Sequence, residues 1–234
     1  MAESAHILAI DTCGPAGSVA LGRLPAGGVE ILGQIELEGR SYSSTLVAAV
    51  GELLDRSGLQ LRQLQAIVAV SGPGSFTGVR VGLAAVKGLA EPGRIPVLAV
   101  SRLEVLAAKA LVRSAALDAH RQEVFLRLGW PDAPARELLA GVDALAAIGP
   151  APSGIAVCDE AAAQLLASAW PGVEQLRTAA PTAADALRLA VPRLRLGEFV
   201  DLESLDGHYL RRSDAEIFGA EIFRSASAPG PAHP

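Results

Sequence analysis

The sequence has few of the residues on which several classes of enzyme depend. Only two cysteines occur among the 234 residues, too few for a disulfide framework. The four histidines are far apart and form no H-x-x-x-H or H-E-x-x-H motif, so zinc or iron ligands do not cluster along the chain. The G-x-S-x-G motif of serine hydrolases is absent as well. We therefore predict no metal site and no catalytic residues.

A surplus of basic charge and long apolar runs are also lacking. The formal net charge is −5, whereas a chain that binds tRNA or DNA by itself needs a basic surface to neutralise phosphates. No apolar run is long enough to cross a bilayer, and the first residues do not form a signal-peptide pattern. These absences predict a cytoplasmic protein that contacts neither membranes nor, by itself, nucleic acids.

Aliphatic residues dominate the composition of the chain, and their spacing predicts an α/β fold. Hydrophobic residues make up 50% of the chain and aromatic residues only 4%. Short apolar runs between turns that contain glycine or proline predict strands at 6–10, 17–22, 29–37, 66–70, 96–100, 115–118, 123–128 and 154–157. Helical periodicity predicts helices at 43–56, 76–90, 102–112, 160–169 and 182–194, the last interrupted by Pro192.

The order of these elements indicates two lobes. In both halves a strand that ends in an acid, Asp11 in the first and Asp118 in the second, turns directly into another strand. The recurrence of this pattern indicates a duplicated βββαβα lobe, with a second copy that is smaller than the first. We assign residues 1–113 to an N-terminal lobe, 114–212 to a C-terminal lobe and 213–234 to a tail. The end of that tail has no apolar period, and we expect it to be mobile.

The most informative stretch is SGPGSFTGVRVGLAAVKGLA, residues 71–90. It lacks the Walker A glycine spacing and its lysine, and the G-x-G-x-x-G spacing of dinucleotide-binding folds fails as well. Ser75 is a good N-cap for the helix that follows. Gly78 and Gly82, with Ala85 one turn further on, leave a smooth strip on which another helix can pack closely. We favour close packing over anion binding, which stays open.

The turn at Asp11 and Thr12 is a second candidate for nucleotide binding. Actin-like ATPases present metal and phosphate with an acid at the end of a strand, followed by a hairpin. Here Pro15 removes one backbone donor from the turn, and the matching turn at Asp118 contains no glycine. We therefore interpret Asp11, Thr12 and Asp118 as a vestigial nucleotide site.

Five segments of the chain resemble, in this order, the TsaB family, also called YeaZ: ILAIDTCGPAGSVAL, SGPGSFTGVRVGLAAVKGLA, IPVLAVSRLEVLA, ALDAHRQEVF and YLRR. The resemblance covers the chain to about residue 212, and GPGSFTGVR-x-G is highly specific to the family. The chain departs from the family at Cys13, where serine is usual, and at Cys158-Asp159-Glu160, where glycines are expected. The resemblance implies the duplicated fold of actin and Hsp70, called the ASKHA fold.

The same resemblance implies a role and partners. The chain would be a non-catalytic subunit of the machinery that forms N6-threonylcarbamoyladenosine at position 37 of tRNA. It would bind and activate a TsaD-like subunit, which carries the metal and transfers the threonylcarbamoyl group. A TsaE-like ATPase would join the complex, tRNA would be met only through the complex, and the chain alone would form a homodimer.

The resemblance implies no cofactor for the chain by itself, although ATP or ADP at the complex interface stays open. Weak ATP binding or ATPase activity of the chain is the alternative to a scaffold role. Family members pair through the helices that correspond to 43–56 and 76–90. On these helices the predicted partner-binding residues are Ser43, Leu46, Val50, Leu53, Phe76, Thr77, Gly78, Val79, Gly82 and Ala85.

Overall fold

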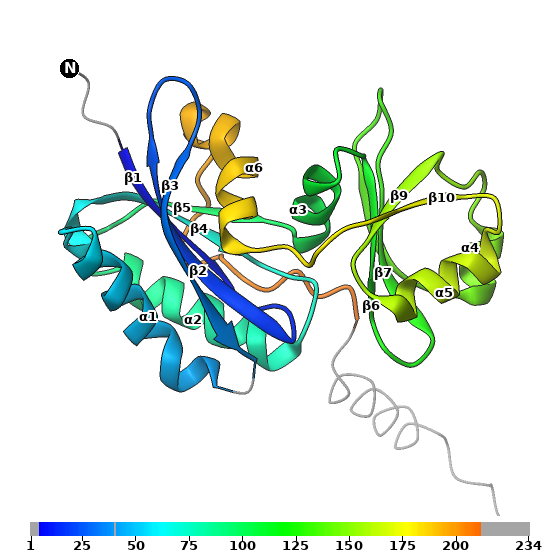
Figure 1. The fold of residues 1–234 in the computed structure, drawn as a ribbon, viewed down its shortest axis with the longest axis horizontal. Coiled ribbons are helices and arrows are strands. Elements are labelled where there is room, and N and C mark those ends of the chain that lie inside the picture. Colours follow the sequence, from blue (N-terminus) through cyan, green and yellow to red (C-terminus); the bar gives the residue numbers. More distant parts are fainter. Residues whose placement is uncertain (1–4, 40, 212–234) are drawn as a thin grey trace, which may run out of the picture.

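The computed structural model describes residues 5–39 and 41–211, which form two lobes side by side (Figure 1). Each lobe contains a five-stranded sheet. The spatial order of the first sheet is β3 (Glu30–Glu38), β2 (Ala16–Leu24), β1 (Ala5–Asp11), β4 (Leu64–Val70) and β5 (Val97–Val100). The spatial order of the second is β10 (Glu174–Arg177), β9 (Gly154–Val157), β6 (Ser114–Asp118), β7 (Glu123–Leu128) and β8 (Arg136–Gly141). The predicted α/β class and its duplication are confirmed.

Both sheets combine hairpins with parallel neighbours. β1 pairs antiparallel with β2 and parallel with β4, and β6 pairs antiparallel with β7 and parallel with β9. Parallel strands end at the same edge of a sheet, which is where open α/β folds usually bind ligands. Cys13, Gly74 and Arg102, which follow β1, β4 and β5, all line a cleft between the lobes. The fold therefore directs residues distant in sequence to one place.

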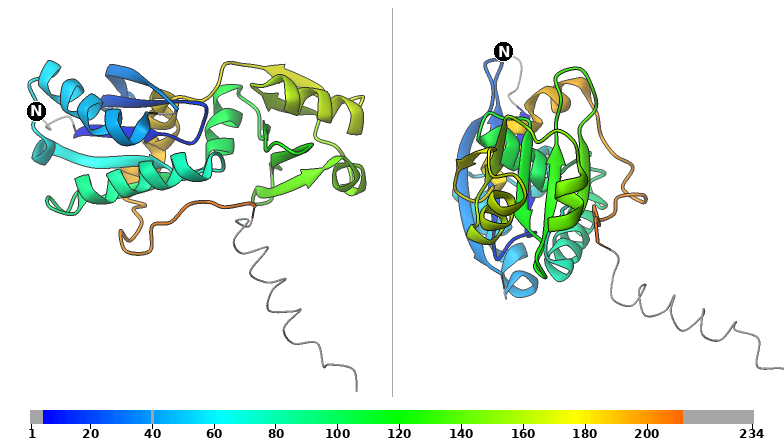
Figure 2. Two further views of the ribbon diagram at one scale, coloured as in Figure 1. Left: turned by 90° about the horizontal axis from the view of Figure 1, so that it is seen from below. Right: turned by 90° about the vertical axis from the view of Figure 1, so that its right-hand side faces the viewer.

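Helices cover both faces of each sheet (Figures 1 and 2). In the first lobe α1 and α2 lie side by side on one face and α6 on the other. In the second lobe α5 packs on β6, β7 and β9, with α4 beside it, and α3 packs on the opposite face, between the two sheets. The bounds are α1 (Tyr42–Arg56), α2 (Phe76–Ala90), α3 (Arg102–Lys109), α4 (Val142–Ala147), α5 (Glu160–Ala169) and α6 (Ala183–Leu196), with a short 3₁₀ helix at Leu61–Gln63.

α2 shows how the local sequence specifies a helix. The side chain of Ser75 accepts a hydrogen bond from the Gly78 N–H at 3.3 Å, which confirms the predicted N-cap. Val79, Leu83 and Val86 recur at helical spacing and are buried. The helix spans the residues predicted for it.

The predicted segment 114–212 does not form one spatial unit. Its last helix, α6, returns to the first lobe and packs on β1, β2 and β4. α6 also continues through Pro192, where an interruption was expected, and ends at Gly197 in a left-handed conformation. The chain then runs along the first lobe, where Val200 pairs with Val97 of β5. The described part of the chain ends against the second lobe, where Arg211 pairs with Glu123 of β7.

Four short elements were not predicted: the 3₁₀ helix at Leu61–Gln63, β8, α4 and β10. α4 has only six residues, and β10 consists of the polar sequence EQLR, so neither carries a clear periodic signal. Among the described residues no helix is both long and apolar enough to cross a membrane. The predicted tail, 213–234, lies outside the described residues.

Candidate functional site

Gly78 and Gly82 of α2 pack against Thr12, a residue of the same chain. A Cβ added at Gly78 would collide with the backbone oxygen of Thr12, and one added at Gly82 would collide with Thr12 Oγ1. Thr12 Oγ1 also donates a hydrogen bond to the Gly78 carbonyl at 2.7 Å. The interpretation of these glycines as an open strip for another helix is therefore wrong. They allow α2 to lie directly on the turn that follows β1.

The ten predicted partner-binding residues differ in accessibility. Ser43 and Thr77 are exposed, and Phe76 and Ala85 are half-buried. The buried ones, which support the helices from inside, are Leu46, Val50, Leu53, Gly78, Val79 and Gly82. No observation tests whether any of the ten touches a partner.

The outer surface of α1 and α2 is formed mainly by residues that the sequence analysis did not select. Val47 is 60% exposed. The other exposed residues of the two helices are partly small and partly charged, the charged ones being Glu52, Asp55, Arg56 and Arg80. We define the α1–α2 face as the exposed residues Ser43, Ser44, Val47, Ala48, Thr77, Ala84 and Gly88. The sequence could have predicted this surface, because the exposed positions alternate with the buried apolar positions at helical spacing.

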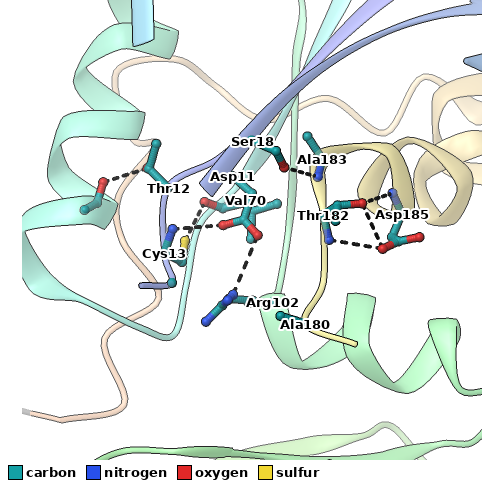
Figure 3. Close-up of polar contacts among 12 residues, drawn as sticks. Asp11, Thr12, Cys13, Ser18, Val70, Arg102, Ala180, Thr182, Ala183 and Asp185 are labelled. Atoms are coloured by element: carbon teal, nitrogen blue, oxygen red, sulfur yellow. Dashed lines mark hydrogen bonds and ion pairs between the residues drawn. The ribbon is translucent and has the colours of Figure 1, made fainter. Parts of the chain in front are cut away.

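Asp11 and Thr12 lie at the end of β1 and are each 1% exposed (Figure 3). Asp11 Oδ1 accepts a hydrogen bond from the Cys13 N–H at 2.8 Å. Asp11 Oδ2 lies 3.6 Å from Nε of Arg102, the first residue of α3, and the two form a buried ion pair. Arg102 was not predicted as a site residue. Its place at the sheet edge follows from the parallel order of β1, β4 and β5.

The buried side chains of Cys13 and Tyr42 form hydrogen bonds at the turn that follows β1. The Sγ of Cys13 donates to the Val70 carbonyl at 3.2 Å, and the Tyr42 hydroxyl donates to the Gly14 carbonyl at 2.8 Å. Burial, with a smaller contribution from the Asp11 charge, raises the pKa of the Cys13 thiol well above its usual value and that of Tyr42 to about 12. Both groups stay protonated at neutral pH, so Cys13 is a structural thiol.

Asp118 lies on the opposite wall, in the second lobe. Its Oδ1 accepts from the His120 N–H at 2.8 Å, and its own N–H donates to the Asp159 carboxylate at 3.0 Å. Asp159 in turn caps α5 by accepting from the Ala162 N–H. The segment at 158–160, where glycines were expected, is thus the start of a helix. The structure brings Asp118 to the cleft but places Asp11 behind Arg102.

The cleft between these walls has a volume of about 700 Å³. Apolar side chains such as Leu117 and Phe125 line much of it, together with the start of α2. Its charged lining residues are Glu38, Arg102, Asp118, Asp159 and Arg211. In the described residues no group of three or more histidine, cysteine, aspartate or glutamate side chains could hold a metal ion.

A polar network fastens the lobes together beside this cleft. Glu137 of β8 accepts hydrogen bonds from the Ser101 hydroxyl and from Arg127, and its Oε2 lies 2.8 Å from Nε2 of His208. Burial alone would raise the pKa of Glu137, but the hydrogen bonds with His208, Ser101 and Arg127 outweigh it and hold the pKa below its usual value. The carboxylate therefore stays ionised and links both lobes to the C-terminal segment.

The sequence of the chain is similar to a known protein family and to several curated proteins. The family described as "TsaD: tRNA N6-adenosine threonylcarbamoyltransferase" matches residues 31–129. Proteins named "tRNA threonylcarbamoyladenosine biosynthesis protein TsaB" are 38% identical in Haemophilus influenzae, over 53% of this chain and 53% of the relative, and 36% identical in Escherichia coli, over 51% and 53%. The chain spans about half the length of these curated relatives.

Solved structures extend the similarity over more of the chain. The structure titled "YeaZ from Pseudomonas aeruginosa" is 30% identical, with a TM-score of 0.70, over 88% of this chain and all of that one. A second Pseudomonas aeruginosa structure, described as similar to "peptidase YEAZ", has a TM-score of 0.72 over the same shares. Component A of a 2-hydroxyglutaryl-CoA dehydratase from Acidaminococcus fermentans shares the fold, with a TM-score of 0.50, 10% identity, and coverage of 83% of this chain and all of that one.

Proposed function

Since the chain belongs to the TsaB/YeaZ family, we propose that it takes part in the formation of threonylcarbamoyladenosine in tRNA. Its role there is that of a non-catalytic subunit, which binds and activates a TsaD-like transferase acting at position 37. The similarity to curated TsaB proteins is the observation that carries this proposal. The chain acts in the cytoplasm, and tRNA reaches it only through the complex.

The α1–α2 face is the surface we assign to the TsaD-like partner. Val47 is 60% exposed, and Ala48, Ala84 and Gly88, which are also exposed on these two helices, lack long side chains. Small residues lose little side-chain entropy when they are buried, and they let the backbone of a partner's helix approach closely. The same face serves for a homodimer when the partner is missing, and a TsaE-like ATPase joins the assembled complex.

The arrangement of Asp11 supports the non-catalytic role over weak ATP binding or ATPase activity. Asp11 is 1% exposed and lies 3.6 Å from Arg102, and the Thr12 hydroxyl is engaged with Gly78. A divalent cation at Asp11 would lie beside a guanidinium of the same sign, which opposes its binding. ATP or ADP is therefore assigned to the complex interface, if anywhere.

The experiment that tests the assigned face is light scattering of the chain mixed with its TsaD-like partner. Val47→Glu combined with Ala84→Glu introduces two charges that pairing would desolvate, so we expect affinity to fall about tenfold or more. Leu111→Glu is the matched control, because Leu111 is 93% exposed and lies outside both helices. Equal complex formation by the double variant and the control would refute the assignment.

A further inference from the structure

One wall of the interlobe cleft holds the guanidinium of Arg102, whose Nε makes no hydrogen bond to the described residues. Arg102 is 5% exposed. The contact with Asp11 Oδ2, at 3.6 Å, is an ion pair that is too long for a hydrogen bond. A guanidinium carries five N–H donors, and a buried donor that stays unpaired, as Nε does here, costs free energy. Arg102 is therefore a group that a ligand can satisfy.

The guanidinium of Arg102 lies against Gly14, and both residues line the cleft. Gly14 lines the same wall, and a Cβ there would collide with Nη2 of Arg102, so this glycine leaves room for the guanidinium. Ser75 and Phe76, at the start of the 15-residue helix α2, also line the cleft. A helix N-terminus carries partial positive charge and favours a negative group nearby.

We propose that the interlobe cleft binds a small monocarboxylate with an apolar body, and that the carboxylate pairs with the Nη atoms of Arg102. The planar fork of arginine matches a carboxylate with two parallel hydrogen bonds. Leu117, Ala119 and Phe125 on the opposite wall provide apolar contacts for the rest of the ligand. A volume of about 700 Å³ lies within the range of small-molecule sites.

The charges around the cleft favour one negative charge over several. Asp11 already shares the charge of Arg102, and Glu38, Asp118 and Asp159 place further carboxylates on the walls. Arg211 is also a lining residue, but it is paired with Glu123. A phosphate dianion would meet more repulsion here than a carboxylate would. The site thus differs in chemistry from a metal–nucleotide site.

The test is calorimetric titration of the full chain with benzoate, which carries a carboxylate on an apolar ring. Benzamide is the uncharged analogue, and inorganic phosphate and Mg²⁺·ADP are the phosphate probes. The variant Arg102→Lys keeps a positive charge beside Asp11 but removes the fork, so we expect benzoate affinity to fall about tenfold. Arg23→Lys changes an exposed, ion-paired arginine in the same way and should leave the affinity within about twofold.

Binding of benzoate in preference to benzamide and both phosphate probes, with the loss confined to Arg102→Lys, would support the proposal. It would be overturned if benzoate does not bind, if Arg102→Lys binds it as well as wild type, or if a phosphate probe binds more tightly. Should Arg102→Lys fail to fold, NMR of the wild type decides. Benzoate must then shift the amide signals of Gly14, Ser75 and Ala119, and shifts confined elsewhere would overturn the proposal. The titration needs no partner, so its failure leaves the proposed function standing.

Discussion

Replacing Arg102 by methionine is expected to destabilise the chain by about 3–5 kcal/mol, as when one partner of a buried ion pair is removed. Asp11 is 1% exposed, and its Oδ2 accepts no hydrogen bond in the described residues, so its charge would be left uncompensated. Urea unfolding followed by circular dichroism measures the change in the free energy of unfolding.

Two companion variants show whether the pair is the cause. Asp11→Asn combined with Arg102→Met removes both charges while an amide oxygen can still accept from the Cys13 N–H, so part of the loss should be recovered. Arg23→Met breaks an exposed pair with Glu30 and should cost at most about 1 kcal/mol. A double variant as unstable as the sum of its single variants would mean that Asp11 and Arg102 do not interact.

Replacing Gly78 by alanine is expected to cost about 2–3 kcal/mol, the usual effect of forcing a methyl group into a closed contact. The added Cβ would collide with the carbonyl oxygen of Thr12, a backbone atom that cannot rotate away. The turn after β1, or α2 itself, would have to move. The same unfolding measurement detects the loss.

Gly88 provides the matched control within the same helix. It is exposed, and a Cβ there meets nothing within 4 Å. Gly88→Ala should therefore stabilise the chain by about 0.5–1 kcal/mol, the gain in helix propensity. Equal effects at Gly78 and Gly88 would show that α2 does not rest on Thr12 in the way described.

Much of the fold could be predicted because its elements carry regular apolar patterns. The strands of the first lobe and α2 follow from continuous apolar runs and from an N-cap at Ser75. Local pattern could not show that α6 packs on the first sheet, since its apolar stripe fits either lobe. Nor could it show that the helix continues past Pro192, because packing of the surrounding stripe overrides the cost of a proline.

The candidate site was predictable only in part. Asp11 and Asp118 were recognised because each ends a strand, and both lie beside the cleft. Arg102 lies far from Asp11 in sequence and opens an ordinary helix, so the segment IPVLAVSRLEVLA that contains it does not reveal the pairing with Asp11. Its role becomes visible only when the parallel order of β1, β4 and β5 is known. The glycines at 78 and 82 signalled close packing correctly, but the packed element belongs to the same chain.

We propose that this chain takes part in the formation of threonylcarbamoyladenosine by pairing through the α1–α2 face, and analysing tRNA nucleosides tests this claim most directly. Mass spectrometry would compare cells depleted of the chain with cells that express the wild type, Leu111→Glu, or Val47→Glu combined with Ala84→Glu. We expect the modified nucleoside to be lost on depletion and restored by the wild type and Leu111→Glu, but not by the double variant. Unchanged modification after depletion, or full restoration by the double variant, would contradict the claim.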